Sequence, residues 1–351
     1  MKGRLALAVV AISFTLVSPW ALVPGTWSGL GPWSVQGPSS VQGPGSLVRR
    51  TAIANRKDQG PRTDQGLGTD QVLGTKNQAP TTAADTVPRR VISLIPATTE
   101  MMFAMGAGER LVAVGSYDKF PPEATRLPKV GALLDPDTER ILSMRPDLVL
   151  MYGTQTELKK SLDRASIPYY SYEHRAMPDI MVTIRALGKR IGFGAQAETL
   201  ASRMERDLAA IRKTVAGRPR PRTLLVFERD TASLQNIYAS GGYGFLADLL
   251  DVAGGENVFG DVKKQAVQAS SEMILSRRPD AIIELRYGDR AREFDPARDL
   301  RAWSSLGSVP AVRAKQIHVL VGDQFVVPGP RIVTAARELG RALHPSAQWT
   351  N

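Results

Sequence analysis

Histidine, cysteine and serine most often bind metals or attack substrates, and this chain offers few of them in a usable pattern. It has 3 histidines, His174, His318 and His344, and no cysteine. A bare Zn²⁺ site needs three or four such ligands, so histidines this far apart do not predict one. No Ser-His-Asp constellation and no G-x-S-x-G turn is present, which argues against a hydrolase.

Aromatic and basic residues, in contrast, recur just after the predicted strands. Aromatic faces stack on flat ligands, and arginines pair with anionic groups. Ligands of open α/β sheets bind beyond the carboxyl ends of the strands. The candidate ligand contacts are Tyr117, Phe120, Tyr152, Gln155, His174, Arg229, Tyr243, Arg286, Tyr287 and Phe325.

Short apolar runs and helical segments alternate from Arg90 onward, which is typical of a parallel α/β lobe. The run "RVISLIP" predicts a strand, and the helix after it is expected to begin at Thr98 or Thr99. The helix in "DPDTERILSMRP" is expected to be capped by Asp135, with Pro136 at its first position. Further strands are predicted at "RLVAVG", "DLVLM" and "IPYYSY".

The second half of the chain repeats the first. Residues 139–149, "ERILSMRPDLV", and residues 272–282, "EMILSRRPDAI", are identical at 7 of 11 positions, which indicates two related lobes. Between the lobes, apolar residues recur at helical spacing and predict one long helix. These residues are Ala197, Leu200, Met204, Leu208, Ile211 and Val215.

The N-terminal region has a different composition. Lys2 and Arg4 precede an apolar run, so residues 1–23 are expected to be a signal peptide or a membrane anchor. Residues 24–88 are rich in Gly, Pro and Gln without apolar periodicity and predict a disordered linker. The remaining expected divisions are an N-terminal lobe at 89–194, a connecting helix at 195–216 and a C-terminal lobe at 217–351.

The net charge of +11 does not by itself indicate a nucleic-acid partner. Basic and acidic residues alternate in the folded part, as in "RMERDLAAIRK", which is typical of a solvated mixed surface. No nucleic-acid-binding motif accompanies them. We therefore expect no nucleic acid among the partners.

Two stretches carry a family resemblance. Residues 90–124, "RVISLIPATTEMMFAMGAGERLVAVGSYDKFPPEA", and 127–150, "LPKVGALLDPDTERILSMRPDLVL", resemble the opening of the helical-backbone metal-chelate receptors. These are periplasmic substrate-binding proteins of ABC importers. The resemblance runs from about Arg89 to Leu343. It implies two parallel-sheet α/β lobes joined by one long backbone helix, with a ligand cleft between the lobes.

The resemblance also implies a function. The chain is expected to be a binding protein, not an enzyme, that captures a corrinoid, a ferric siderophore or haem and delivers it to a permease and its ATPase. The corrinoid comes first because the opening motifs resemble the vitamin B12 branch most closely. We expect a periplasmic monomer without a cofactor, free or tethered by its N-terminal segment. A membrane-tethered chelate sensor or scaffold, or a chelatase-like enzyme, stays open as an alternative.

In this family one surface glutamate on each lobe docks against arginines of the permease. The matching positions are Glu139 and Glu272, the first residues of the internal repeat. A glutamate in the first turn of a helix also complements the helix dipole, so a purely local role stays open. No residue is expected to bind a bare metal ion, but His174 is a candidate axial ligand for cobalt or iron.

Overall fold

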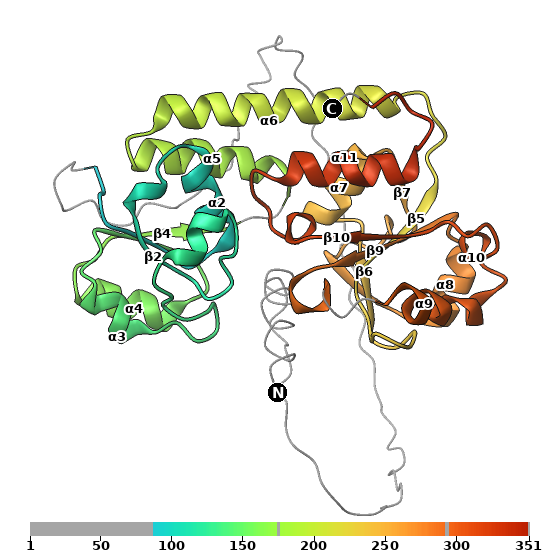
Figure 1. Cartoon of the computed structure of the whole chain (residues 1–351), viewed down its shortest axis with the longest axis horizontal. Helices are drawn as coiled ribbons and strands as arrows, with labels where there is room; N and C mark the ends of the chain where they lie inside the picture. Colours follow the sequence, from blue (N-terminus) through green and yellow to red (C-terminus); the bar gives the residue numbers. More distant parts are fainter. Residues whose placement is uncertain (1–86, 174–175, 292–294, 350–351) are drawn as a thin grey trace, which may run out of the picture. The chain divides into compact units, whose positions relative to one another are not determined.

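Four short, mostly apolar strands form the sheet of the first lobe in the computed structural model (Figure 1). The structure describes residues 87–349, except 174–175 and 292–294; the predicted signal or anchor and almost all of the predicted linker lie outside this part. The strands are β1 (Val91–Ser93), β2 (Leu111–Val114), β3 (Leu148–Tyr152) and β4 (Tyr169–Tyr172). They are all parallel, in the order β2-β1-β3-β4.

Short helices connect these strands. They are α2 (Pro96–Ala104), η1 (Gly108–Arg110), η2 (Pro122–Arg126), α3 (Thr138–Ser143), α4 (Thr156–Arg164) and α5 (Pro178–Arg190). The predicted start of α2 at Thr98 or Thr99 is wrong, because Pro96 already occupies its first position, where a proline needs no hydrogen-bond partner. The predicted cap of α3 is also wrong. Asp137 is the cap and accepts from the backbone N–H of Arg140 at 3.0 Å.

The second lobe has a mixed sheet in the order β10-β9-β5-β6-β8. Its strands are β5 (Arg222–Glu228), β6 (Ile237–Ser240), β7 (Glu256–Asn257), β8 (Ala266–Ala269), β9 (Ala281–Arg286) and β10 (Ile317–Val321). Strands β5, β7, β9 and β10 are parallel to one another, as predicted for an α/β lobe, whereas β6 pairs antiparallel with both β5 and β8. The helices are α7 (Phe245–Val252), α8 (Ser271–Arg277), η3 (Gly288–Ala291), α9 (Pro296–Asp299), η4 (Leu300–Leu306), α10 (Pro310–Arg313), η5 (Asp323–Phe325) and α11 (Ile332–Leu343).

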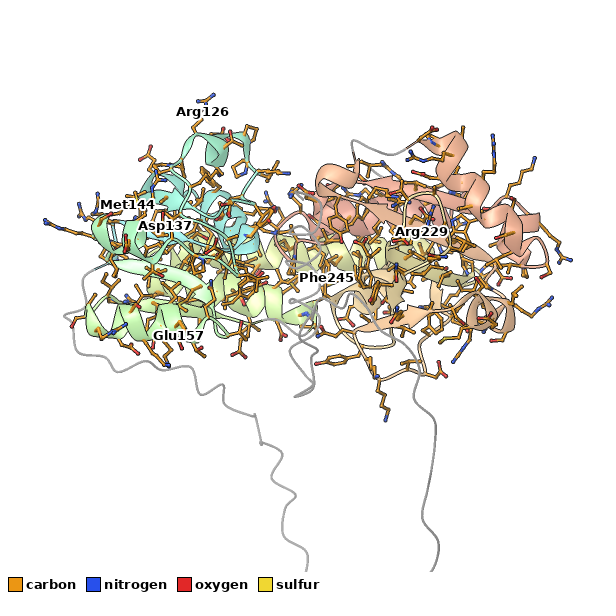
Figure 2. All side chains as sticks on the ribbon, turned by 90° about the horizontal axis from the view of Figure 1, so that it is seen from below. Arg126, Asp137, Met144, Glu157, Arg229 and Phe245 are labelled. Atoms are coloured by element: carbon orange, nitrogen blue, oxygen red, sulfur yellow. The ribbon has the colours of Figure 1, made fainter. Side chains whose placement is uncertain are left out.

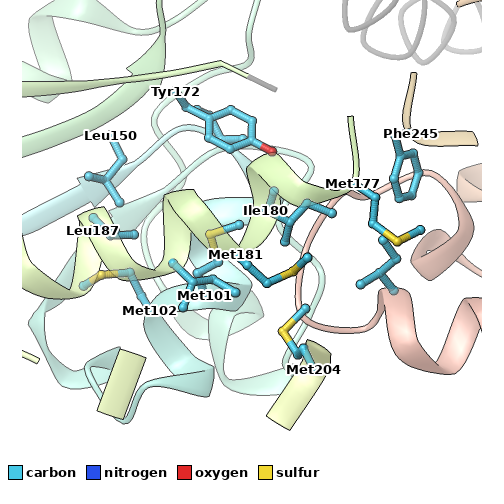
Figure 3. Packing of buried hydrophobic residues seen from close by; sticks show 14 of the residues in the cluster. Met101, Met102, Leu150, Tyr172, Met177, Ile180, Met181, Leu187, Met204 and Phe245 are labelled. Carbon is cyan, nitrogen blue, oxygen red and sulfur yellow. The ribbon is translucent and has the colours of Figure 1, made fainter. Parts of the chain in front are cut away.

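The predicted long helix is α6 (Gly194–Val215), and all six residues of its apolar stripe are buried. It packs against α5 of the first lobe and against α7 and α11 of the second (Figure 1). One hydrophobic core runs through both lobes and α6. Figure 3 shows part of it, where Met177 of the first lobe lies beside Phe245 of the second. The two-lobe α/β prediction is confirmed, and the lobes share a core as well as a helix.

Candidate functional site

The loop after β2 carries the first two predicted contacts. Tyr117 is half-buried and Phe120 is 42% exposed, so both rings have surface to offer a ligand. Asp118 lies between them in the chain and is buried. The Lys129 ammonium group fixes the loop by donating hydrogen bonds to the carbonyl oxygens of Asp118 and Ala124, at 2.8 and 3.1 Å. The loop therefore exposes part of Tyr117 and Phe120 and buries Asp118 between them in the chain.

The carboxyl group of Asp118 makes no well-formed hydrogen bond within the described part of the chain, and neither does the buried hydroxyl of Thr99. Burial raises the pKa of Asp118 to about 7. The Thr99 hydroxyl and the Lys129 ammonium act in the opposite direction, and the carboxylate of Glu100 raises this pKa further. Asp118 consequently changes its protonation state close to neutral pH, next to the aromatic residues of the loop.

Tyr152 and Gln155, at the end of β3, are mostly buried. Gln155 accepts a hydrogen bond from the backbone N–H of Tyr152 at 3.0 Å and donates one to the carbonyl oxygen of Leu133 at 2.9 Å. The Tyr152 ring meets Tyr172 edge-on, with 5.7 Å between ring centroids. Gln155 and Leu134 also line a surface pocket of about 310 Å³. These contacts brace the strand end, and Gln155 keeps access to solvent through the pocket.

The histidines do not form a metal site within the described residues. His174 lies outside them, so its predicted role stays a prediction. Burial lowers the pKa of both His318 and His344. His344 is buried with its Nε2 3.2 Å from the carbonyl oxygen of Gly254. In the part of the chain that the structure describes, no three His, Cys, Asp or Glu side chains are grouped to hold a metal ion.

Two predicted contacts, Arg229 and Arg286, lie inside the second lobe, where Figure 2 labels Arg229. They are 1% and 4% exposed. Both pair with Glu284: Arg229 Nε lies 2.6 Å from Oε1, and Arg286 Nη2 lies 2.8 Å from Oε2. The indole N–H of Trp303 donates to the same carboxylate. In this conformation the two arginines present almost no surface to a ligand and instead hold the ends of β5 and β9.

The other second-lobe candidates differ in exposure. Tyr243, in the glycine-rich loop before α7, is 43% exposed, whereas Phe325 is fully buried in the core. Tyr287 is partly buried, and its hydroxyl donates to Glu228 Oε2 at 3.4 Å. Burial raises the pKa of Tyr287, so its hydroxyl stays neutral and keeps its proton. Tyr243 and Tyr287 therefore present surface, whereas Phe325 is part of the core.

A pocket between the lobes contains charged residues that the sequence did not single out. It measures about 370 Å³ and is lined by Glu100, Phe103, Ala104, Phe120, Pro121, Glu123, Pro330 and Arg331. Arg331, just before α11, donates two hydrogen bonds to the carboxylate of Glu100 on α2, at 3.0 and 2.5 Å. The guanidinium carbon of Arg331 also lies 4.1 Å from the ring centroid of Phe120. An ion pair and an aromatic stack thus join the lobes beside one predicted contact.

Glu139 and Glu272 occupy matching places in the two lobes. Each is exposed and lies in the first turn of a helix, α3 and α8 respectively. Asp137 caps α3, and Ser270 caps α8 by accepting from the backbone N–H of Met273 at 3.3 Å. The nearby Ser270 hydroxyl lowers the pKa of Glu272, which keeps that carboxylate charged at neutral pH. Both glutamates are thus exposed, and neither of them is its helix's cap.

No helix within the described ranges is both long and apolar enough to cross a membrane.

The chain is similar to proteins that bind ligands outside the cytoplasm. A family model described as periplasmic binding protein matches residues 91–323. The vitamin B12-binding proteins of Pectobacterium carotovorum and Salmonella typhimurium are each 30% identical to it, over 74% and 72% of this chain and 89% and 90% of theirs.

Solved structures show the same fold. A periplasmic vitamin B12 binding protein of Vibrio cholerae has a TM-score of 0.63 at 24% identity, covering 74% of this chain and 98% of its own. A periplasmic heme binding protein from Pseudomonas aeruginosa has a TM-score of 0.63 at 23% identity, covering 75% and 95%. At this level of identity the likeness supports the two-lobe α/β fold.

Proposed function

Because the chain belongs to the periplasmic binding protein family, we propose that it captures a metal chelate outside the cytoplasm and delivers it to the permease and ATPase of an ABC importer. The observation that carries this proposal is the 30% identity to vitamin B12-binding proteins across 89% of their length. The exposed aromatic residues at the strand ends of both lobes suit a large, flat ligand.

A corrinoid is the favoured chelate. The curated relatives are named for vitamin B12, and two of the solved neighbours are named for vitamin B12 and for heme. Haem or a ferric siderophore comes next. These relatives are binding proteins and not enzymes, which supports the same role here, with the chelate as cargo and no cofactor. A sensor or scaffold would bind the same chelate without passing it to a permease.

The contacts we propose follow from exposure. Tyr117, Phe120, Tyr243 and Tyr287 would supply aromatic surface. Gln155 is 9% exposed and its amide is hydrogen-bonded to the backbone, so it would shape the pocket at the first-lobe rim. The buried residues of the predicted set would support the ligand-contacting residues without touching the ligand. They are Tyr152, Arg229, Arg286 and Phe325. His174 stays a proposed axial ligand for the chelated metal. Glu139 and Glu272 would dock on the permease.

The direct test is an absorption and fluorescence titration of the purified protein with cyanocobalamin, haemin and ferric siderophores. We expect micromolar or tighter binding of cyanocobalamin, with weaker binding of the others. Tight binding of haemin with no affinity for cyanocobalamin would reverse the order of ligands. Absence of binding to every chelate would reject the proposed function.

A further inference from the structure

Phe120 is the most exposed aromatic residue of the first-lobe loop, yet one face of its ring is already covered. The guanidinium group of Arg331, from the opposite lobe, lies 4.1 Å from the ring centroid. Phe120 still exposes 42% of its surface, so part of the ring stays open. A guanidinium plane stacked on an aromatic ring is attracted by the electrons of that ring, and it restricts the tilt of the ring.

Arg331 can restrain the ring because it is itself held. Its Nε and Nη2 atoms both donate to Glu100, a carboxylate that is 3% exposed on α2. Burial raises the pKa of Glu100, and the hydrogen bonds from Arg331 oppose that rise, so the ion pair favours the charged form. A two-pronged pair fixes the plane of the guanidinium as well as its position. The chain of contacts therefore runs from α2 through Arg331 to Phe120.

The rest of the loop is held by other groups. Lys129 donates to the carbonyl oxygens of Asp118 and Ala124, which fixes the backbone on both sides of Phe120. The stack with Arg331 acts on the Phe120 ring itself, whereas these hydrogen bonds act on the backbone. A flexible ring at this place would lose freedom when a ligand stacked on it, and that loss would weaken binding.

We propose that Arg331 is a positioning residue of the ligand site, which holds the Phe120 ring in its ligand-ready orientation without touching the ligand. This inference rests on the proposed function. The positive charge behind the ring also makes its open face more attractive to an electron-rich or anionic conjugated ligand. Glu100 acts one step further back, by holding Arg331.

The decisive variant is Arg331→Lys. Lysine keeps a positive charge for Glu100 but has no planar group to lie flat on the ring. We expect R331K to bind cyanocobalamin about five- to tenfold more weakly than the wild type does. Quenching of protein fluorescence measures the binding. The same titration on F120A and on F120A/R331K completes a double-mutant cycle. If Arg331 acts through Phe120, R331K should change little once the ring is absent.

Arg110 provides a matched control. Its guanidinium carbon lies 4.6 Å from the centroid of the Phe193 ring, and Arg110 stands at the opposite end of β2 from the loop, so R110K removes a similar stack. R110K should bind cyanocobalamin like the wild type. Equal losses for R331K with and without Phe120 would overturn the positioning role, and so would an F120A variant of normal affinity. The same variants are titrated with haemin, because haem is the second proposed ligand.

A measurement without ligand separates this inference from the proposed function. 4-Fluorophenylalanine placed at position 120 of the full chain reports the surroundings of the ring by fluorine NMR. We expect one shifted resonance in the wild type and an averaged one, closer to the free amino acid, in R331K. Identical spectra would overturn the inference even if cyanocobalamin binds. Different spectra in a protein that binds no chelate would leave the ring restraint standing and reject the proposed function.

Discussion

The backbone N–H of Met177 donates a 2.8 Å hydrogen bond to Asp248 Oδ2, and this bond links the start of α5 in the first lobe to α7 in the second. Burial raises the pKa of Asp248, and the bond from Met177 opposes that rise. Tyr172 adds a second link, since its hydroxyl donates to the carbonyl oxygen of Pro328 at 3.3 Å. Together with the Glu100–Arg331 pair, these contacts hold the lobes at three places apart from α6.

Little closure on ligand binding is therefore expected. Moving one lobe against the other would have to break these three contacts and disturb a core that both lobes share. Small-angle scattering curves of the protein with and without saturating cyanocobalamin should superimpose. A clear fall in the radius of gyration on binding would indicate a flexible hinge instead.

Replacement of Asp118 should change how stability depends on pH. The pKa of this carboxyl is raised from 3.8 to about 7, so between about pH 4 and pH 7 the folded protein keeps a proton that the unfolded chain loses. Stability therefore falls as the pH rises through this window, by about 4 kcal/mol if the whole shift is realised. Asn resembles the protonated acid, so D118N should equal the wild type at pH 4 and exceed it at pH 8.

Urea unfolding at pH 4, 6 and 8 measures this difference. Asp261 is a control whose pKa is shifted in the opposite direction, because its hydrogen bond with Arg277 lowers the pKa of this carboxyl. D261N should lose stability relative to the wild type above about pH 4, where the charged form of Asp261 is favoured. A constant offset between D118N and the wild type at all three pH values would contradict the assignment.

Removing the charge of Glu284 should destabilise the second lobe severely. Its carboxylate neutralises Arg229 and Arg286, and all three side chains are at most 4% exposed. E284Q would remove the carboxylate that two buried guanidinium groups share, at a cost of about 3–5 kcal/mol. Glu256 is the matched control, because its pair with Arg222 is exposed and E256Q should cost less than about 1 kcal/mol. Chemical denaturation of both variants gives the comparison.

Replacement of Glu139 and Glu272 tests docking. Both glutamates are exposed and neither caps its helix, so E139A/E272A should fold and bind the chelate like the wild type. Uptake of labelled cyanocobalamin by cells that depend on this protein should fall. Glu157 lies in the first turn of α4 and is also exposed, so E157A should transport normally. Loss of folding or of chelate affinity in the double variant would favour a local helical role.

Patterns local in the sequence predicted the lobes and α6 well. The apolar stripe of α6 follows from helical period alone, and every member of it is buried. Helix starts were less reliable, because Asp135 and Asp137 are both good caps and only the turn closed between Ala132 and Asp135 decides between them. That turn occupies the first aspartate and leaves the second to cap α3.

The candidate site was predicted less completely because burial and pairing depend on contacts between distant segments. In the sequence, Arg229 and Arg286 stand at the ends of predicted strands, where a side chain can reach a ligand. In the structure both form buried ion pairs with Glu284. A signal was present, since Glu284 stands inside the apolar run "AIIEL" and a buried carboxylate requires a partner. The Glu100–Arg331 pair joins residues of opposite lobes, and no local pattern indicates it.

The shared core has a consequence for the order in which the chain can fold during synthesis. Helix α11 supplies Ile332, Ala335, Ala336 and Leu339 to the same apolar cluster as the first strand and α5. Because α11 packs against α6 and α7, part of the apolar stripe of the long helix stays uncovered until residues 332–343 have been synthesised.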